Sequence, residues 1–548
     1  MVTKFSKKFE QFLLLFLPIS FLLFFLVLPI LFTLLLSFSN ISNGNFTIQN
    51  YFAVLNDPLN VYFIYWTFYE SILSTILSII IGLGSSYILS HYSIPGKKMI
   101  RNFLTIPFLL PSITVLIGFI AVFGNSIYSS NGVILANLFY NLPLMIRITE
   151  LGWMSINPEY EVIAKSLSMN RLTYFLKVEL PHLLPSLLTA SLLVFIYSFN
   201  NFATVLVLTG SRYQTIEVRI YYLFFRLKFN QASALAVISL LINIIVIMVY
   251  LHFSSNYQSN SINYTYDTKE LQQFRRYSFK NKLIRYGIFF LYATAIFVIC
   301  VLPLFAIIQK SLIVNNTVTL RNYKNLLKTI IQPYGLTIQQ MIYNSLFFAT
   351  IVLIVSIVFS LLLNLGLHYK NTGTRVPLLS FDYLINIIVI LPLMVSAVIL
   401  IYSIFSLYKT TPLYSDIPLV IIISHVLIAF PFANKIVASA RATISQEMLD
   451  VGKSLGLNRT ALFFKIELPL LWSGILVAGI FSFAISIGEF AATFFITRSN
   501  TATIPLGIYR LISLRDIAGA SALSSILIIV TLGIFYFMER FSKFDLRI

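Results

Sequence analysis

Long apolar segments dominate this chain and restrict its possible folds more than any other feature. About twelve of them are long enough to cross a bilayer, since a helical span needs about 20 mostly apolar residues. They are continuously apolar rather than alternating, which favours helices over strands in lipid. The prediction is an all-α polytopic membrane protein with spans near 12–37, 62–90, 103–124, 130–152, 184–208, 229–254, 284–313, 338–368, 380–408, 417–443, 471–496 and 518–538.

The charge content agrees with a membrane location. Only 10% of the 548 residues are charged, whereas a soluble domain carries roughly 25%. The net charge of +19 would suggest nucleic acid in a soluble protein, but basic residues beside anionic lipid headgroups explain it better. We therefore expect the lipid bilayer as a partner and no nucleic acid.

Motifs for chemistry are missing from the sequence. The single cysteine, Cys300, lies in an apolar run, and the five histidines are scattered without metal-ligand spacing. There is no Walker lysine motif and no nucleophile with a nearby base. We therefore predict no catalytic residue, no metal site and no cofactor bound by this chain.

Basic residues suggest the orientation of the spans. They cluster in the N-terminal tail, at 97–101, between 254 and 285 and in the C-terminal tail, and an even number of spans lets all of these face the cytoplasm. Other basic residues fall in loops that this topology places outside. Those segments either dip back as short helices or face an acidic partner, and the sequence does not decide between the two.

A duplication divides the chain into two related halves. Residues 165–181 and 453–469 agree at ten of seventeen positions at an offset of 288. We predict a first six-span half at 1–253, a cytoplasmic linker at 254–285 and a second six-span half at 286–548. Because six is even, the halves are parallel repeats, and a passage is expected at their interface.

The most similar segment of the two halves is a polar loop rather than a packing surface. Each copy, near 155–181 and 443–469, contains a predicted short helix followed by a Leu-Pro pair that is expected to open the next span. A surface presented twice suits docking on a two-fold partner; a helix lying on lipid headgroups is the alternative. We interpret the repeated charges as part of that partner's footprint: Lys165, Arg171, Lys177 and Glu179, and Lys453, Arg459, Lys465 and Glu467.

These loops resemble the cytoplasmic loop signature of permease subunits of ATP-binding-cassette importers. That signature is Glu-Ala-Ala, three residues, Gly and, further on, Leu-Pro. Asp450-Val451-Gly452, Gly456 and Leu468-Pro469 occupy these positions in the second half; Val162-Ile163-Ala164, Ser168 and Leu180-Pro181 occupy them in the first. The resemblance implies ATPase-docking residues Glu159, Glu161, Ala164, Ser168, Glu447, Asp450, Gly452 and Gly456.

The wider chain is similar to fused permeases of ferric-iron and thiamine importers. The resemblance implies two type-I importer transmembrane bundles in a bacterial cytoplasmic (inner) membrane. It also implies two partners, an ATPase dimer that holds ATP and Mg and a solute-binding protein outside. The solute implied is ferric iron or thiamine, and the segment from Thr215 to Tyr221 leans toward thiamine.

Few carboxylates lie within the predicted spans, namely Glu70, Glu150 and Glu489. Ion-coupled carriers commonly hold such groups, so their scarcity favours ATP-driven transport. An ion-coupled secondary transporter of parallel-repeat architecture remains the alternative, and a lipid-facing scaffold without transport is a third possibility. Asn200, Asn201 and Glu489 are predicted to line the translocation pathway, unless they serve only as interhelical hydrogen bonds.

Overall fold

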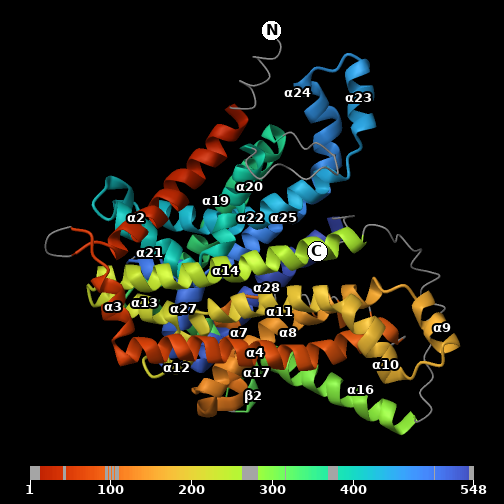
Figure 1. Ribbon diagram of the computed structural model, residues 1–548. Coiled ribbons are helices and arrows are strands. Elements are labelled where there is room, and N and C mark those ends of the chain that lie inside the picture. The colour runs from red at the N-terminus through yellow and green to blue at the C-terminus, as the bar shows by residue number, and fades with distance from the viewer. Residues whose placement is uncertain are drawn as a thin grey trace. The chain divides into compact units, whose positions relative to one another are not determined.

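The computed structural model describes residues 13–40, 45–92, 97, 100, 101, 104, 110–261, 282–314, 316–367, 381–498 and 500–541 (Figure 1). Residues 262–281 of the predicted linker lie outside these residues, as do residues 1–12, residues 542–548 and Pro107 in the predicted third span. So do the side chains of Asp382 and Arg459.

The described residues confirm the predicted all-α membrane fold. Ten of their helices are long and apolar enough to cross a bilayer. Residues 387–408 add an eleventh span only if two helices bent by 106° are counted together. The ten are Leu13–Ser37, Pro58–His91, Ser130–Met154, Arg171–Phe199, Phe229–Phe253, Phe290–Leu312, Ile338–Gly366, Ile417–Ala442, Thr460–Gly488 and Ile517–Ile534.

Two predicted spans differ from the structure. The third, expected at 103–124, is a short helix, α7 (Ser112–Phe123), within the described residues. The ninth, expected as one helix at 380–408, breaks at Val395 and Ser396 into α20 (Phe381–Met394) and α21 (Ala397–Tyr408). Ser396 caps α21 by accepting a hydrogen bond from the Ile399 N–H, so a new helix with its own N-cap begins at the break.

The chain folds into two compact units, one of which comprises residues 51–110 and 115–310. Its helices pack around α8 and α11, where α4 runs parallel to α8 and α11 runs antiparallel to it, and short helices join their ends (Figure 1). The elements are α4 (Pro58–His91), most of α7, α8 (Ser130–Met154), α9 (Glu159–Ser166), α10 (Arg171–Tyr174), α11 (Leu180–Phe199), α12 (Ala203–Thr209), α13 (Ile216–Phe225), α14 (Phe229–Ser261), α16 (Lys282–Ile296) and most of α17 (Leu302–Leu312).

The other unit comprises residues 1–50, 111–114 and 311–548. It repeats the same helix order around α22 and α25 and adds two small antiparallel hairpins, β1 with β2 and β3 with β4. The elements are α2 (Leu28–Ser37), β1 (Ile313–Val314), β2 (Thr317–Val318), α18 (Arg321–Leu326), β3 (Ile330–Ile331), β4 (Leu336–Thr337), α19 (Ile338–Gly366), α20, α21, α22 (Ile417–Ala442), α23 (Gln446–Ser454), α24 (Arg459–Leu462), α25 (Leu468–Gly488), α26 (Ala491–Ile496), α27 (Ile504–Ser513) and α28 (Ile517–Phe541). The short α3 (Gln49–Leu55) spans the junction of the two units.

The first helix of each sequence half packs in the unit formed by the other half. The helix Leu13–Ser37 lies against α21 and α22 of the second half, and residues 282–310 lie against α4 and α8 of the first. Thr33 Oγ1 donates to Ser403 Oγ over 2.9 Å, and the Phe21 and Phe359 ring centroids are 5.0 Å apart. The compact units therefore differ from the sequence halves 1–253 and 286–548 by this exchange.

Four Leu-Pro pairs share one local structure. Each follows a five-residue π-helical turn, and the helix continues through the proline. Proline has no N–H and its ring crowds the preceding turn, so a wider turn relieves both problems inside a long helix. The prediction that Leu180-Pro181 and Leu468-Pro469 open new spans is therefore wrong, because the helices Arg171–Phe199 and Thr460–Gly488 run through them.

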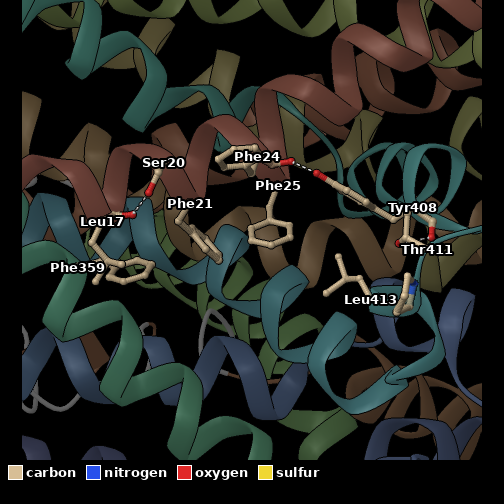
Figure 2. Close-up of a pocket in the computed structure, with 10 residues that line it drawn as sticks. Leu17, Ser20, Phe21, Phe24, Phe25, Phe359, Tyr408, Thr411 and Leu413 are labelled. Atoms are coloured by element: carbon tan, nitrogen blue, oxygen red, sulfur yellow. Dashed lines mark hydrogen bonds between the residues drawn. The ribbon is translucent and has the colours of Figure 1, made fainter.

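One π-turn leaves a backbone carbonyl without its usual donor. The Leu28 N–H bonds to the Leu23 carbonyl, five residues back, and Pro29 has no N–H to offer. The Phe24 carbonyl thus loses both nearby backbone donors, which is costly in lipid. Figure 2 shows the Tyr408 hydroxyl reaching this oxygen, to which it donates over 2.7 Å. The apolar cavity beside it, about 470 Å³ and lined largely by aromatic side chains, offers nothing that would bind a polar solute.

Tyr408→Phe is expected to destabilise the attachment of the first helix. The change removes only the hydroxyl, so the Phe24 carbonyl is left without a donor in the hydrocarbon region at a cost of about 1 kcal/mol. The melting temperature of the purified protein in nanodiscs measures this. Tyr343→Phe is the matched control, because Tyr343 is 66% exposed and only stacks on Phe347. Equal melting temperatures for both variants would contradict the role given to Tyr408.

Candidate functional site: paired projecting loops and broken spans

Two short helices project from the ends of the long helices, one in each unit. They are α9, between α8 and α11, and α23, between α22 and α25 (Figure 1). Asn157 Oδ1 accepts a hydrogen bond from the Glu159 N–H at the start of α9, over 2.9 Å. Ser445 Oγ plays the corresponding part for α23 by accepting from the Met448 N–H. Polar side chains thus initiate both helices, as expected for a helix start.

Both projecting helices end in the same Schellman motif. In the first, the Met169 N–H bonds to the Ala164 carbonyl over 2.9 Å and the Ser168 N–H to the Lys165 carbonyl over 3.0 Å. In the second, Leu457 and Gly456 make the same bonds to the carbonyls of Gly452 and Lys453. This pattern pairs carbonyls that a helix end would otherwise leave without donors.

The motif needs a residue with positive φ, and both copies have one. Gly456 has φ +79°, and Ser168 has φ +54° although serine carries a Cβ. The left-handed conformation costs roughly 1–2 kcal/mol for a residue other than glycine. The first loop therefore keeps the geometry of the second at the expense of local strain.

Ala164 and Gly452 face inward, not outward. Ala164 is buried, and a Cβ at Gly452 would lie 2.6 Å from Leu462 Cδ1 and 2.8 Å from Ile466 Cδ1. These small residues let the projecting helix lie close to the helix that follows it. Their contribution is to hold the loop in shape.

The four predicted acidic residues lie on the projecting helices. Glu159 and Glu447 are exposed in the first turns, where a negative charge is favourable. Glu161 pairs with Lys165 over 2.7 Å. Asp450 pairs with Lys453 over 2.7 Å, and hydrogen bonds from Lys453 and Gln446 lower the pKa of this carboxyl. Glu159, Glu447 and Asp450 are exposed and thus available to solvent or a partner.

Two members of the repeated charge set are not part of an exposed surface. Glu179 and Glu467 are buried, and they pair with Arg171 over 3.2 Å and with Arg441 over 3.4 Å. The interpretation of these glutamates as a partner's footprint is therefore wrong. They fix the following helix from inside because a buried carboxylate needs a cationic partner. Lys177 and Lys465 remain exposed.

Exposed apolar side chains accompany the two loops, and sequence reasoning missed them. Three pairs at the offset of 288 are each more than half exposed: Ile163 with Val451, Leu167 with Leu455, and Leu176 with Phe464. The signal that could have found them is their apolar character in both copies of an otherwise polar loop. Repeated exposed apolar groups at corresponding positions are typical of an interaction surface.

A break follows one span in each unit, at the predicted pathway residues. The helix ending at Phe199 is followed by α12, and the helix ending at Gly488 is followed by α26. Asn201 Oδ1 accepts from the Thr204 N–H over 3.2 Å, and Glu489 Oε1 accepts from the Ala492 N–H over 3.0 Å. The two residues, equivalent in the repeat, thus cap equivalent short helices.

Polar side chains hold each break in place from a neighbouring helix. In one unit Asn201 donates to Asn137 Oδ1 over 2.5 Å, and Asn137 donates to Glu70 over 2.7 Å. The counterpart of Asn137 in the repeat is His425, which lies 2.9 Å from both Ser486 Oγ and Thr493 Oγ1. Asn200, beside Asn201, accepts from Asn243 over 2.9 Å. The breaks are therefore defined structures.

Glu150, the third carboxylate predicted within a span, is engaged in ion pairs. It is buried at the end of α8, where Arg101 Nε donates to it over 2.7 Å and Arg147 lies 3.6 Å away. Among the described residues no cluster of three His, Cys, Asp or Glu side chains could hold a metal ion.

Residues 74–259 and 377–543 each match one protein family, described as the binding-protein-dependent transport system inner membrane component. The two matches include both projecting loops and both broken spans. The chain belongs to this family. It is a multi-pass membrane permease, and the family domain is present in two copies.

Similar curated proteins are permeases of several transport systems. The thiamine transport system permease protein ThiP of Haemophilus influenzae is 23% identical over 90% of this chain and 91% of its own length. The molybdate/tungstate permease protein WtpB of Thermococcus kodakarensis is 24% identical over 36% of this chain and 81% of its own. The sulfate permease protein CysT of Salmonella typhimurium is 27% identical over 36% and 78%. The first similarity extends over both halves of this permease.

Proposed function

We propose that this permease is the transmembrane subunit of an ATP-driven importer and that its two projecting loops bind an ATPase dimer. The observation that supports this most is the duplicated loop. One chain presents the same Schellman-ended helix twice, with the same exposed apolar positions. A dimeric partner with two equivalent grooves matches such a pair, in the way that an amphipathic helix docks into an apolar groove. ATP and Mg would be held by that partner.

The transport cycle follows from the stiffness of each loop. Gly452 on the projecting helix α23 packs closely against Leu462 and Ile466 of the long helix that follows it, and that helix runs without interruption to the break at Glu489. Closure of the ATPase dimer would thus move loop and span together as a rigid lever. A solute-binding protein would deliver the solute on the opposite side, and the halves would alternate in access.

Thiamine is the solute that we propose. The relative that matches nearly the whole chain is named as a thiamine permease, whereas those named for molybdate/tungstate and sulfate match 36% of it. The half-buried carboxylate of Glu489 adds a chemical reason, since a negative charge attracts a cation such as thiamine and repels molybdate or sulfate. The relatives described above do not extend this support to ferric iron.

Co-purification tests the docking proposal. A cassette ATPase from the same organism, expressed with the tagged permease, is expected to elute with it and to hydrolyse ATP in the complex. An ATPase that never associates with the unmodified permease would refute docking. The ion-coupled alternative would then be tested by uptake driven by a proton or sodium gradient alone.

A further inference from the structure

The second half has an extramembrane loop with its own secondary structure, and the first half has no equivalent in its described part. Residues 313–337 form β1, β2, α18, β3 and β4 between the first two long helices of that half. The corresponding connection in the first half, residues 38–57, contains only α3 and a single bridge, Ser39 with Phe46, in its described part. The duplication therefore does not account for this loop.

The loop is strongly basic. It contains Arg321, Lys324 and Lys328, all exposed, and no acidic residue, whereas residues 38–57 contain no lysine or arginine. Within the described residues no ion pair joins these three cations to a carboxylate. The loop thus carries three positive charges that no described carboxylate of the permease neutralises.

Neighbouring segments extend the basic surface. Arg510 Nε on α27 donates to the Gln332 carbonyl over 2.5 Å, which places the turn between α27 and α28 beside the loop. That turn adds the exposed Arg515. The adjacent acid, Asp516, caps α28 by accepting from the Gly519 N–H over 2.8 Å. We call Arg321, Lys324, Lys328 and Arg515 the basic platform.

Hydrogen bonds hold the platform rigid. Tyr323 on α18 lies 2.9 Å from Ser311 Oγ and 2.7 Å from Ser525 Oγ on α28. Gln339 Nε2 at the start of α19 donates to the Leu327 carbonyl over 3.3 Å. Exposed apolar side chains stand among the cations, including Leu320 and Leu327. A preordered surface of this kind loses little entropy when a folded partner binds.

The platform lies at the opposite end of its unit from the projecting helix α23. α19 begins at Ile338, directly after the loop, and its later residue Leu361 packs on Ala440 just before α23. If α23 binds the ATPase, the platform is extracytoplasmic. Basic residues usually accumulate on the cytoplasmic side, where the leaflet is anionic. Attraction to that leaflet therefore cannot explain a basic surface on the far side.

We propose that the basic platform binds an acidic face of the solute-binding protein, an inference that rests on the proposed function. Carboxylates on one lobe of that protein would meet the cations, and its apolar side chains would meet Leu320 and Leu327. Because the first half lacks an equivalent loop, the platform would also determine which lobe docks on which half. Charge complementarity of this kind mainly speeds association and fixes orientation.

The test is a triple charge reversal, Arg321→Glu with Lys324→Glu and Lys328→Glu, in the full permease–ATPase complex. The probe is a purified thiamine-binding protein from the same organism, and its affinity is measured at low and at physiological ionic strength. At low ionic strength we expect the dissociation constant to rise at least tenfold, as for the loss of several steering charges. The salt dependence of binding should flatten as well.

The matched control is Arg212→Glu with Arg226→Glu and Lys228→Glu. These residues are exposed in the other unit, in loops that the same topology places outside, and the change in net charge is identical. We expect a clearly smaller effect on binding than for the platform variant. Equal effects of the two variants, or an unchanged affinity in the platform variant, would overturn the proposal.

Two further readouts separate this proposal from neighbouring explanations. The platform variant should bind the ATPase as tightly as the unmodified permease does. If the unmodified permease itself fails to bind the ATPase, the proposed function is wrong, and this outcome is distinct from a failure of the platform proposal. Phosphatidylglycerol vesicles provide the lipid comparison. If the reversal weakens vesicle binding but leaves the affinity for the binding protein intact, the platform is a lipid surface and the proposal is wrong.

Discussion

Gly456→Val is expected to weaken ATPase binding by about tenfold, because the second projecting loop can no longer end in its Schellman motif. Gly456 has φ +79°, and a β-branched residue in this conformation costs at least 1–2 kcal/mol, which corresponds to about a tenfold change in an equilibrium constant. A Cβ at this position meets nothing within 4 Å, so the backbone conformation is the main source of this cost. Titration of the ATPase against the permease in nanodiscs measures the effect.

The first loop supplies the control for this variant. Gly456→Ser copies the residue that stands at the equivalent position, where Ser168 already adopts φ +54°. We therefore expect Gly456→Ser to retain most of the ATPase affinity and Ser168→Gly to retain or slightly improve it. If Gly456→Val bound the ATPase as tightly as Gly456→Ser, the backbone geometry of the loop would not matter for docking.

Glu489→Asn is expected to reduce thiamine uptake at least tenfold while leaving the fold intact. Asparagine at the equivalent position 201 caps the equivalent helix, so the substitution keeps the cap of α26 and removes only the negative charge. If the carboxylate meets a cationic solute in a partly desolvated passage, its loss should cost more than a surface charge would. Uptake of radiolabelled thiamine into proteoliposomes and the melting temperature are measured together.

Glu489→Leu separates the charge from the cap. This variant removes both, so it should lose uptake and also lose the stability of one cap, a free energy of about 1 kcal/mol. The lost stability should appear as a lower melting temperature. A Glu489→Asn permease that transports thiamine at the normal rate would show that Glu489 is structural. The alternative would then hold, in which Asn200, Asn201 and Glu489 serve only in interhelical hydrogen bonds.

The sequence was sufficient for the fold class and for the two loops because both depend on local patterns. Apolar length predicts a span, and the offset of 288 predicts that whatever one loop forms, the other forms too. The turn at Ser168 is the exception. A serine in place of the glycine leaves a left-handed turn in doubt from sequence, yet Ser168 adopts positive φ as Gly456 does.

Features that depend on packing partners could not be predicted in the same way. Hydropathy does not show which bundle a helix joins, so the exchange of Leu13–Ser37 into the second unit was not foreseen. Proline was expected to begin a span at Pro181 and Pro469, whereas a π-turn accommodates it inside the helix. Glu179 and Glu467 have the polarity of surface residues, and only the neighbouring arginines make their burial possible.

The most direct test of the central claim is thiamine uptake by the permease reconstituted with the ATPase and the solute-binding protein. Uptake is expected to require ATP on the side of the vesicle membrane that carries the ATPase and the binding protein on the other side. It should persist when a protonophore collapses the ion gradient. Uptake that stops with the protonophore and proceeds without ATP would contradict an ATP-driven importer.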